Sequence, residues 1–189
     1  MRFFEKISFE QFKRDIVVDK KLYDSYLLPR RGSKNSCGYD FISFKDIISY
    51  LRLVQNTSDN LSLNRIINEP KRGIGKTSLD NIAQVAEQNN VSMYEVIKNA
   101  DQYGLNRVYL NSREFINCME EIIARKDELT LSELIKKILK DTGYTKALEN
   151  ENTVEAENRI ANLDEFLTVA MEFEEQEADS GLSDFLEGI

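Results

Sequence analysis

Chain breakers are scarce in this sequence, and their scarcity limits the folds that are open to it. Only eight Gly and two Pro occur among the 189 residues. The apolar residues Ile47, Ile48, Leu51 and Val54 recur every three or four positions, which is the spacing that places side chains on one face of a helix. Most of the chain shows the same spacing. The sequence therefore predicts an all-α, multi-helix bundle.

Helix boundaries can be placed from the apolar pattern and the capping residues. Helices are predicted at residues 44–55, 61–67, 77–88, 112–125 and 152–175, and capping boxes at Ser8–Gln11, Ser92–Glu95 and Thr130–Glu133 open further short helices. Leu28–Phe41 holds Pro29, Gly32 and Gly38, which indicates a linker. We therefore expect an N-terminal arm over residues 1–43 and a helical domain over residues 44–189.

Composition excludes several kinds of site. The chain has no His, so an imidazole base, a catalytic triad and a His-ligated metal are all excluded. Cys37 and Cys118 are 81 positions apart, and we expect two reduced thiols rather than metal ligands. No apolar run is long enough to span a bilayer, and the charged start does not fit a secretory signal. A cytoplasmic protein with no metal and no membrane contact is expected.

Charge is unevenly distributed along the chain. Residues 149–189 contain thirteen acidic residues and one basic residue, whereas residues 1–148 contain 24 basic and 20 acidic residues. The net charge of −8 therefore conceals a body that is slightly basic. Such a body can present a phosphate-binding face while the acidic end repels phosphate.

One segment, residues 68–79, combines glycines with cations. It contains Gly75-Lys76-Thr77, as a nucleotide-binding phosphate loop does, but Pro70 stands where that loop requires its first Gly. A helical pattern precedes the segment, where a phosphate loop would follow a buried strand. We therefore do not expect this segment to bind ATP.

The same segment resembles the turn of a helix-hairpin-helix element. Two glycines allow the backbone to approach a ligand closely, and Ile74 between them is expected to point into the core. The first amides of the next helix would then face an anion. The predicted DNA-phosphate contacts are Lys71, Arg72, Gly73, Ile74, Gly75, Lys76, Thr77 and Ser78. The alternative is that the segment is only a tight turn between two helices.

Four segments carry a family resemblance: residues 46–56, 61–75, 142–144 and 157–167. From about residue 44 to the C-terminus, the chain resembles the accessory 2B subdomain of UvrD/PcrA/Rep-type superfamily 1 DNA helicases. The resemblance implies that the Gly-Ile-Gly loop touches duplex DNA. A second implied contact is formed by Thr142, Gly143 and Tyr144.

The ATPase motor of these helicases contains a phosphate loop, an Asp-Glu box and an arginine finger. None of the three has a counterpart in the chain. We therefore expect no catalytic residue and no cofactor here, with ATP and Mg belonging to the motor of a parent 3′–5′ helicase of DNA repair. The implied partners are the backbone of duplex or junction DNA and the helicase motor domains. No small-molecule ligand is expected.

The first 43 residues do not fit the helicase pattern. Gly38-Tyr39-Asp40-Phe41 is similar to the first motif of trimeric dUTP pyrophosphatases, where Asp40 would lie near magnesium. Cys37 stands where that family usually has Ala, and the later motifs are absent, so no pyrophosphatase activity is expected. The chain looks like a fusion of two segments.

The sequence leaves two functions open. The first is a non-catalytic, regulatory DNA-binding module that acts through the Gly-Ile-Gly loop. The alternative is a protein-interaction module whose acidic C-terminal helix, residues 152–179, docks a basic partner through Glu172, Glu174, Glu175 and Glu177.

Overall fold

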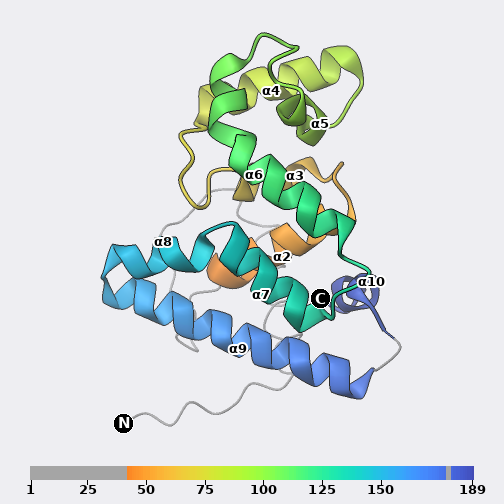
Figure 1. The fold of residues 1–189 in the computed structure, drawn as a ribbon, viewed down its shortest axis with the longest axis vertical. Helices are drawn as coiled ribbons and strands as arrows, with labels where there is room; N and C mark the ends of the chain where they lie inside the picture. The colour runs from red at the N-terminus through yellow and green to blue at the C-terminus, as the bar shows by residue number, and fades with distance from the viewer. Residues whose placement is uncertain (1–41, 178–179) are drawn as a thin grey trace, which may run out of the picture.

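The computed structural model describes residues 42–177 and 180–189, which form helices joined by short turns, with no strand among them (Figure 1). The helices are α2 (Ile42–Gln55), α3 (Asn60–Ile66), α4 (Lys76–Asn89), α5 (Met93–Lys98), α6 (Asn106–Ala124), α7 (Leu131–Asp141), α8 (Tyr144–Glu151), α9 (Val154–Gln176) and α10 (Leu182–Glu187). The all-α prediction is confirmed.

Several boundaries differ from the prediction. Helix α6 begins at Asn106 rather than at the predicted Ser112. The sequence pattern does not show its first six residues as helical, because only Val108 is buried among them and the apolar spacing there is weak. Helices α8 and α10 were not predicted. Residues 42 and 43, which were assigned to the arm, belong to α2. The rest of the arm, the Ser8 capping box and the dUTP pyrophosphatase similarity concern residues 1–41, which lie outside the described residues, and they stay predictions.

The predicted caps explain where two helices begin. At the start of α7, Thr130 accepts a hydrogen bond from the Glu133 amide and the Glu133 side chain accepts one from the Thr130 amide. At the start of α5, the Ser92 side chain accepts a hydrogen bond from the Glu95 amide. These bonds satisfy amides that have no partner within the helix.

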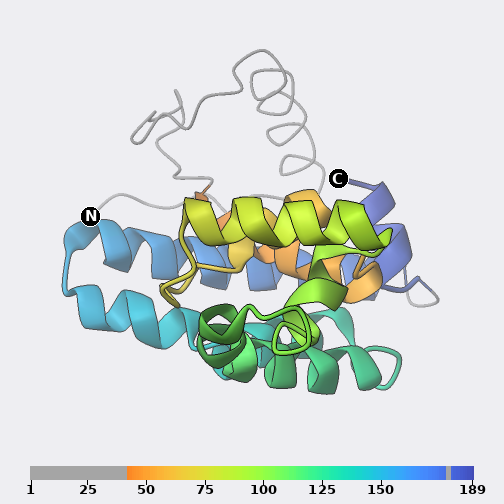
Figure 2. The ribbon, with the colours of Figure 1, turned by 90° about the horizontal axis from the view of Figure 1, so that it is seen from above.

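Helix α2 lies at the centre of the described fold, packed against α3, α6, α7, α9 and α10. The long helix α9 runs along one side, whereas α4 and α5 lie at the opposite end of the molecule (Figure 1). From above, α4 crosses over the region of α2 and α3 (Figure 2). Tyr50 of α2 is fully buried and contacts the rings of Phe115 and Tyr144, at centroid distances of 6.4 and 6.5 Å.

A buried polar cluster joins α2 to three other helices. The carboxylate of Asp46, 2% exposed, accepts hydrogen bonds from Arg65 Nε at 2.7 Å and from the Tyr144 hydroxyl at 2.6 Å. Arg159 of α9 lies 3.6 Å from the same carboxylate and donates a hydrogen bond to the Tyr144 hydroxyl. Burial raises the pKa of Asp46, while Arg65, Tyr144 and Arg159 counteract part of that rise. The two guanidinium groups thus offset part of the cost of burying a carboxylate.

Candidate nucleic-acid interface

The Gly-Ile-Gly loop connects α3 to α4. Gly73 has a left-handed backbone, with φ +72°, a conformation that favours glycine. Ile74 is 1% exposed, which confirms that it points into the core. Gly75 then precedes α4 in an extended conformation and provides no side-chain cap. The loop therefore has an inward anchor between two glycines that leave its backbone bare.

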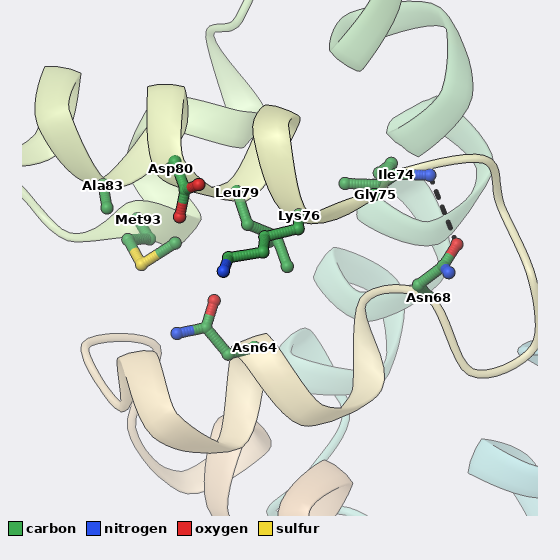
Figure 3. Close-up of a pocket in the computed structure, with 9 residues that line it drawn as sticks. All are labelled: Asn64, Asn68, Ile74, Gly75, Lys76, Leu79, Asp80, Ala83 and Met93. Atoms are coloured by element: carbon green, nitrogen blue, oxygen red, sulfur yellow. Dashed lines mark hydrogen bonds between the residues drawn. The ribbon is translucent and has the colours of Figure 1, made fainter.

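Two asparagines fix the loop backbone. The Asn68 side-chain oxygen accepts hydrogen bonds from the amides of Arg72 at 2.8 Å and Ile74 at 3.2 Å, and the second bond is drawn in Figure 3. Asn111 of α6 donates a hydrogen bond to the Gly73 carbonyl at 3.3 Å. Both asparagines were missed by the sequence analysis. Asn68 precedes a turn and could have been recognised, but Asn111 is 38 positions from Gly73 and carries no local signal.

Arg72 was predicted to contact DNA, but its guanidinium is directed toward the protein. One terminal nitrogen, Nη1, donates to the carbonyls of Ile66, Ile67 and Pro70, each at 3.1 Å. The other terminal nitrogen, Nη2, donates to the Tyr50 hydroxyl at 3.2 Å and to one further main-chain carbonyl. The guanidinium is thus occupied by oxygens of the protein itself.

The further carbonyl bound by Arg72 is that of Thr142, which lies 3.3 Å from Nη2. The structure thus brings the second predicted DNA contact, residues 142–144, next to the loop. The Thr142 hydroxyl donates to Ile138 O at 2.6 Å, and Gly143 caps α8 with φ +74°. Tyr144 is 2% exposed and its hydroxyl lies in the Asp46 cluster. Both hydroxyl groups of this segment are therefore used within the fold.

Two of the predicted phosphate contacts are lysines whose charge is not paired with a nearby carboxylate in the described part of the chain. Lys71 and Lys76 are exposed, and neither forms an ion pair with another of the described residues. Lys76 extends over a groove of about 440 Å³ between α3 and α4, toward Asn64 on the other wall (Figure 3). The groove is lined by Asn64, Asn68, Ile74, Gly75, Lys76, Leu79, Asp80, Ala83 and Met93.

A third cation near the loop was missed by the sequence analysis. Arg107 of α6 is exposed and precedes Asn111 by one helical turn, so both lie on the same face of the helix. Since Asn111 contacts Gly73, this face borders the loop. Arg107 is far from the loop in sequence, so only the fold reveals the proximity.

The N-terminus of α4 offers hydrogen-bond donors. The amides of Lys76, Thr77 and Ser78 belong to its first turn, where a helix lacks internal acceptors. No acidic residue occupies that turn and no side chain caps it. The positive end of the helix dipole and the free donors therefore favour an anion at this point.

Other chemistries find little support within the described part of the chain. That part contains no group of three or more acidic or Cys side chains that could hold a metal ion, and none of its helices is long and apolar enough to cross a membrane. Burial raises the pKa of the free thiol of Cys118 to about 11, so the thiol stays protonated near neutral pH.

At the acidic end of α9, Glu174 has an internal role. Glu174 accepts a hydrogen bond from the Ser132 amide at 2.6 Å and another from the Ser132 hydroxyl at 3.1 Å. Its carboxylate thereby caps the N-terminus of α7. Glu175 and Glu177 are exposed.

Comparison with known proteins agrees with this architecture. The UvrD-like helicase C-terminal domain family matches residues 39–189. The ATP-dependent DNA helicase PcrA of Staphylococcus aureus (strain Mu50) is 39% identical over 138 residues, which cover 72% of this chain and 19% of the relative. The PcrA helicase of Staphylococcus epidermidis (strain RP62A) matches with the same identity and coverage. The chain thus spans about a fifth of the length of these relatives. Since the family match extends over most of its length, the chain belongs to the UvrD-like helicase C-terminal domain family.

Proposed function

We propose that this chain is the accessory 2B subdomain of a superfamily 1 DNA helicase and binds the backbone of duplex or junction DNA through residues 71–78. The observation that carries the proposal is the uncapped N-terminus of α4, held beside a bare glycine loop with exposed lysines. The named relatives are ATP-dependent DNA helicases. In this proposal the chain itself is not an enzyme, and a motor elsewhere in the longer protein supplies ATP hydrolysis with Mg.

The roles of the loop residues follow from their exposure. Lys71, Lys76 and Arg107 attract phosphate by charge, and the first amides of α4 donate hydrogen bonds to it. Gly75, which has open space where a Cβ would lie, allows a DNA strand to approach the protein backbone. These groups all act on phosphate and none reads a base edge, so we expect binding that is independent of sequence and sensitive to salt.

Fluorescence anisotropy with a labelled hairpin duplex tests the proposal on the 189-residue chain. We expect the affinity to fall as salt rises, and the Lys71→Glu, Lys76→Glu double variant to bind at least about tenfold more weakly. The matched control is Lys136→Glu, Lys140→Glu, which makes the same charge change at exposed positions on α7. If the loop variant binds as tightly as wild type, or if both double variants lose equal affinity, the loop is not the DNA contact.

Docking of a basic partner on the acidic end of α9 is the alternative. The hydrogen bonds of Glu174 to α7 remove one of the four carboxylates proposed for that role. Such a partner would bind less tightly to a Glu175→Lys, Glu177→Lys variant and equally well to the loop variant, which separates the two functions.

A further inference from the structure

We infer that Arg72 is a positioning residue of the DNA-binding loop: its guanidinium holds the loop in place by binding the protein's own oxygens and does not itself neutralise a phosphate. The inference rests on the proposed function, because it assigns a role within the same interface. It also separates Arg72 from Lys71, its neighbour in sequence.

The first argument is the set of acceptors at the end of α3. The carbonyls of Ile66 and Ile67 lie where that helix ends and carry the negative end of its dipole. Arg72 Nη1 lies 3.1 Å from both, and 3.1 Å from the carbonyl of Pro70 in the loop. The side chain thus folds the loop back onto the helix that precedes it.

The second argument is the number of elements that meet at the same guanidinium. Nη2 binds the Tyr50 hydroxyl of α2 and the Thr142 carbonyl at the α7–α8 turn. The Cζ atom of the guanidinium lies over the Phe115 ring of α6, 4.8 Å from the ring centroid. One side chain therefore connects the loop to helices up to 70 positions away in sequence.

The geometry requires arginine rather than any cation. A guanidinium is planar, has five donors and stacks on an aromatic ring, whereas an ammonium group has three donors and no flat face. A lysine at position 72 would keep the charge, but it could not donate hydrogen bonds to all of these oxygens and also lie flat over the Phe115 ring. Because Gly73 follows directly, movement of residue 72 would displace the Gly-Ile-Gly backbone.

This difference makes Arg72→Lys the decisive variant. A residue that contacts phosphate through its charge would tolerate lysine and lose affinity only on Arg72→Gln. For a positioning residue, we expect both variants to lower the affinity for hairpin duplex by a similar factor, about tenfold or more. We also expect amide hydrogen exchange of residues 73–78, measured by mass spectrometry, to become faster in both.

Three further variants distinguish loop positioning from other causes of lost DNA affinity or faster loop exchange. Arg65→Lys is the matched control, because Arg65 also reaches α2 with a partly buried guanidinium, at Asp46 and the Ile42 carbonyl. It should lower the melting temperature while loop exchange and affinity stay as in wild type.

Lys76→Gln should lower the slope of log affinity against log salt by about 0.9 without faster loop exchange. Tyr50→Phe, a milder change, removes one acceptor of Arg72 together with the hydrogen bond from the Tyr50 hydroxyl to the Glu69 carbonyl. It should accelerate loop exchange even if the Arg72 variants do not fold.

The outcomes separate the inference from the proposed function. Wild-type affinity in Arg72→Lys, or unchanged loop exchange in the folded Arg72 variants, would overturn the inference and leave the loop as the DNA contact. If wild type does not bind the duplex, or Lys76→Gln changes neither affinity nor slope, the proposed function fails. Faster exchange of residues 73–78 in Arg72→Lys would then still show that Arg72 holds the loop.

Discussion

The two glycines of the Gly-Ile-Gly turn have different structural requirements. Gly73 has φ +72°, and a Cβ there would lie 3.0 Å from the Asn111 side-chain nitrogen. Gly75 has φ −92°, and a Cβ there would meet no atom within 4 Å. The fold therefore needs glycine at position 73, whereas position 75 is open on the side from which a ligand would approach.

Alanine substitution should separate these roles. Gly73→Ala should lower the free energy of unfolding by about 1–2 kcal/mol, because a left-handed backbone is costly for a residue with a Cβ. Gly75→Ala should cost less than about 1 kcal/mol, yet it should weaken DNA binding, because its methyl group stands beside the open amides of α4. Urea unfolding and duplex anisotropy measure the two effects. Equal stability losses, or full DNA affinity in Gly75→Ala, would contradict this assignment.

The sequence alone does not show which of several neighbouring cations faces solvent. Ile74 was correctly predicted to be buried, because an apolar residue between two glycines gains by entering the core. The inward direction of Arg72 depends on Tyr50 and Thr142, which are 22 and 70 positions away. No local pattern encodes those acceptors, and for this reason Arg72 was grouped with Lys71 and Lys76.

At the scale of the helices, the prediction succeeded where a helix has its own apolar stripe or cap. The helices at 42–55, 76–89 and 154–176 lie within two residues of their predicted bounds, and the Thr130 capping box is present. Helix α10 was missed because it has only six residues, too few to show a period. The helical spacing of Leu79, Ile82, Ala83 and Ala86 predicts that all four lie on the buried side of α4. Ala83 is instead exposed at the groove, since α4 buries only Ile82 and Ala86 fully.

The N-terminus of α7 is capped twice, once by its own residues and once by α9. Thr130 and Glu133 form the local box, and Glu174 binds the Ser132 amide from another helix. The sequence predicts the local box, because its members are three positions apart. The second cap depends on the packing of α7 against α9.

Removing the tertiary cap should destabilise the fold. Glu174→Ala should lower the free energy of unfolding by about 1–2 kcal/mol, because it leaves the amide of the buried Ser132 without its acceptor. Glu175→Ala, at an exposed neighbouring position, is the control and should change it by less than about 0.5 kcal/mol. Urea titration gives both values. A loss that is equal in the two variants would show that Glu174 acts only through its charge.

Across the whole molecule, the acidic end and the proposed DNA contact lie apart. The loop that precedes α4 is at the left in Figures 1 and 2, whereas the C-terminal end of α9 lies toward the right in both. The carboxylates at the C-terminal end of α9 therefore lie away from the loop. A duplex at the loop would avoid the carboxylates of residues 172–177, so a net charge of −8 is compatible with phosphate binding.

The last described helix closes the core at a distance from the loop. Phe185 of α10 is fully buried, with ring centroids 6.0 Å from Phe166 and 5.2 Å from Phe173, and α10 also packs on α2. Phe185→Ala should therefore lower the free energy of unfolding by about 3–5 kcal/mol. The control is Ser183→Ala, at an exposed position of the same helix, which should be close to wild type.

DNA affinity should respond differently from stability in this pair of variants. At a temperature where circular dichroism shows Phe185→Ala to be fully folded, its affinity for the hairpin duplex should equal that of wild type. The reason is that the proposed contacts belong to the loop, α4 and α6, and none belongs to α10. An affinity that falls in proportion to stability would instead mean that binding depends on the packing of the whole core and is not localised at the loop.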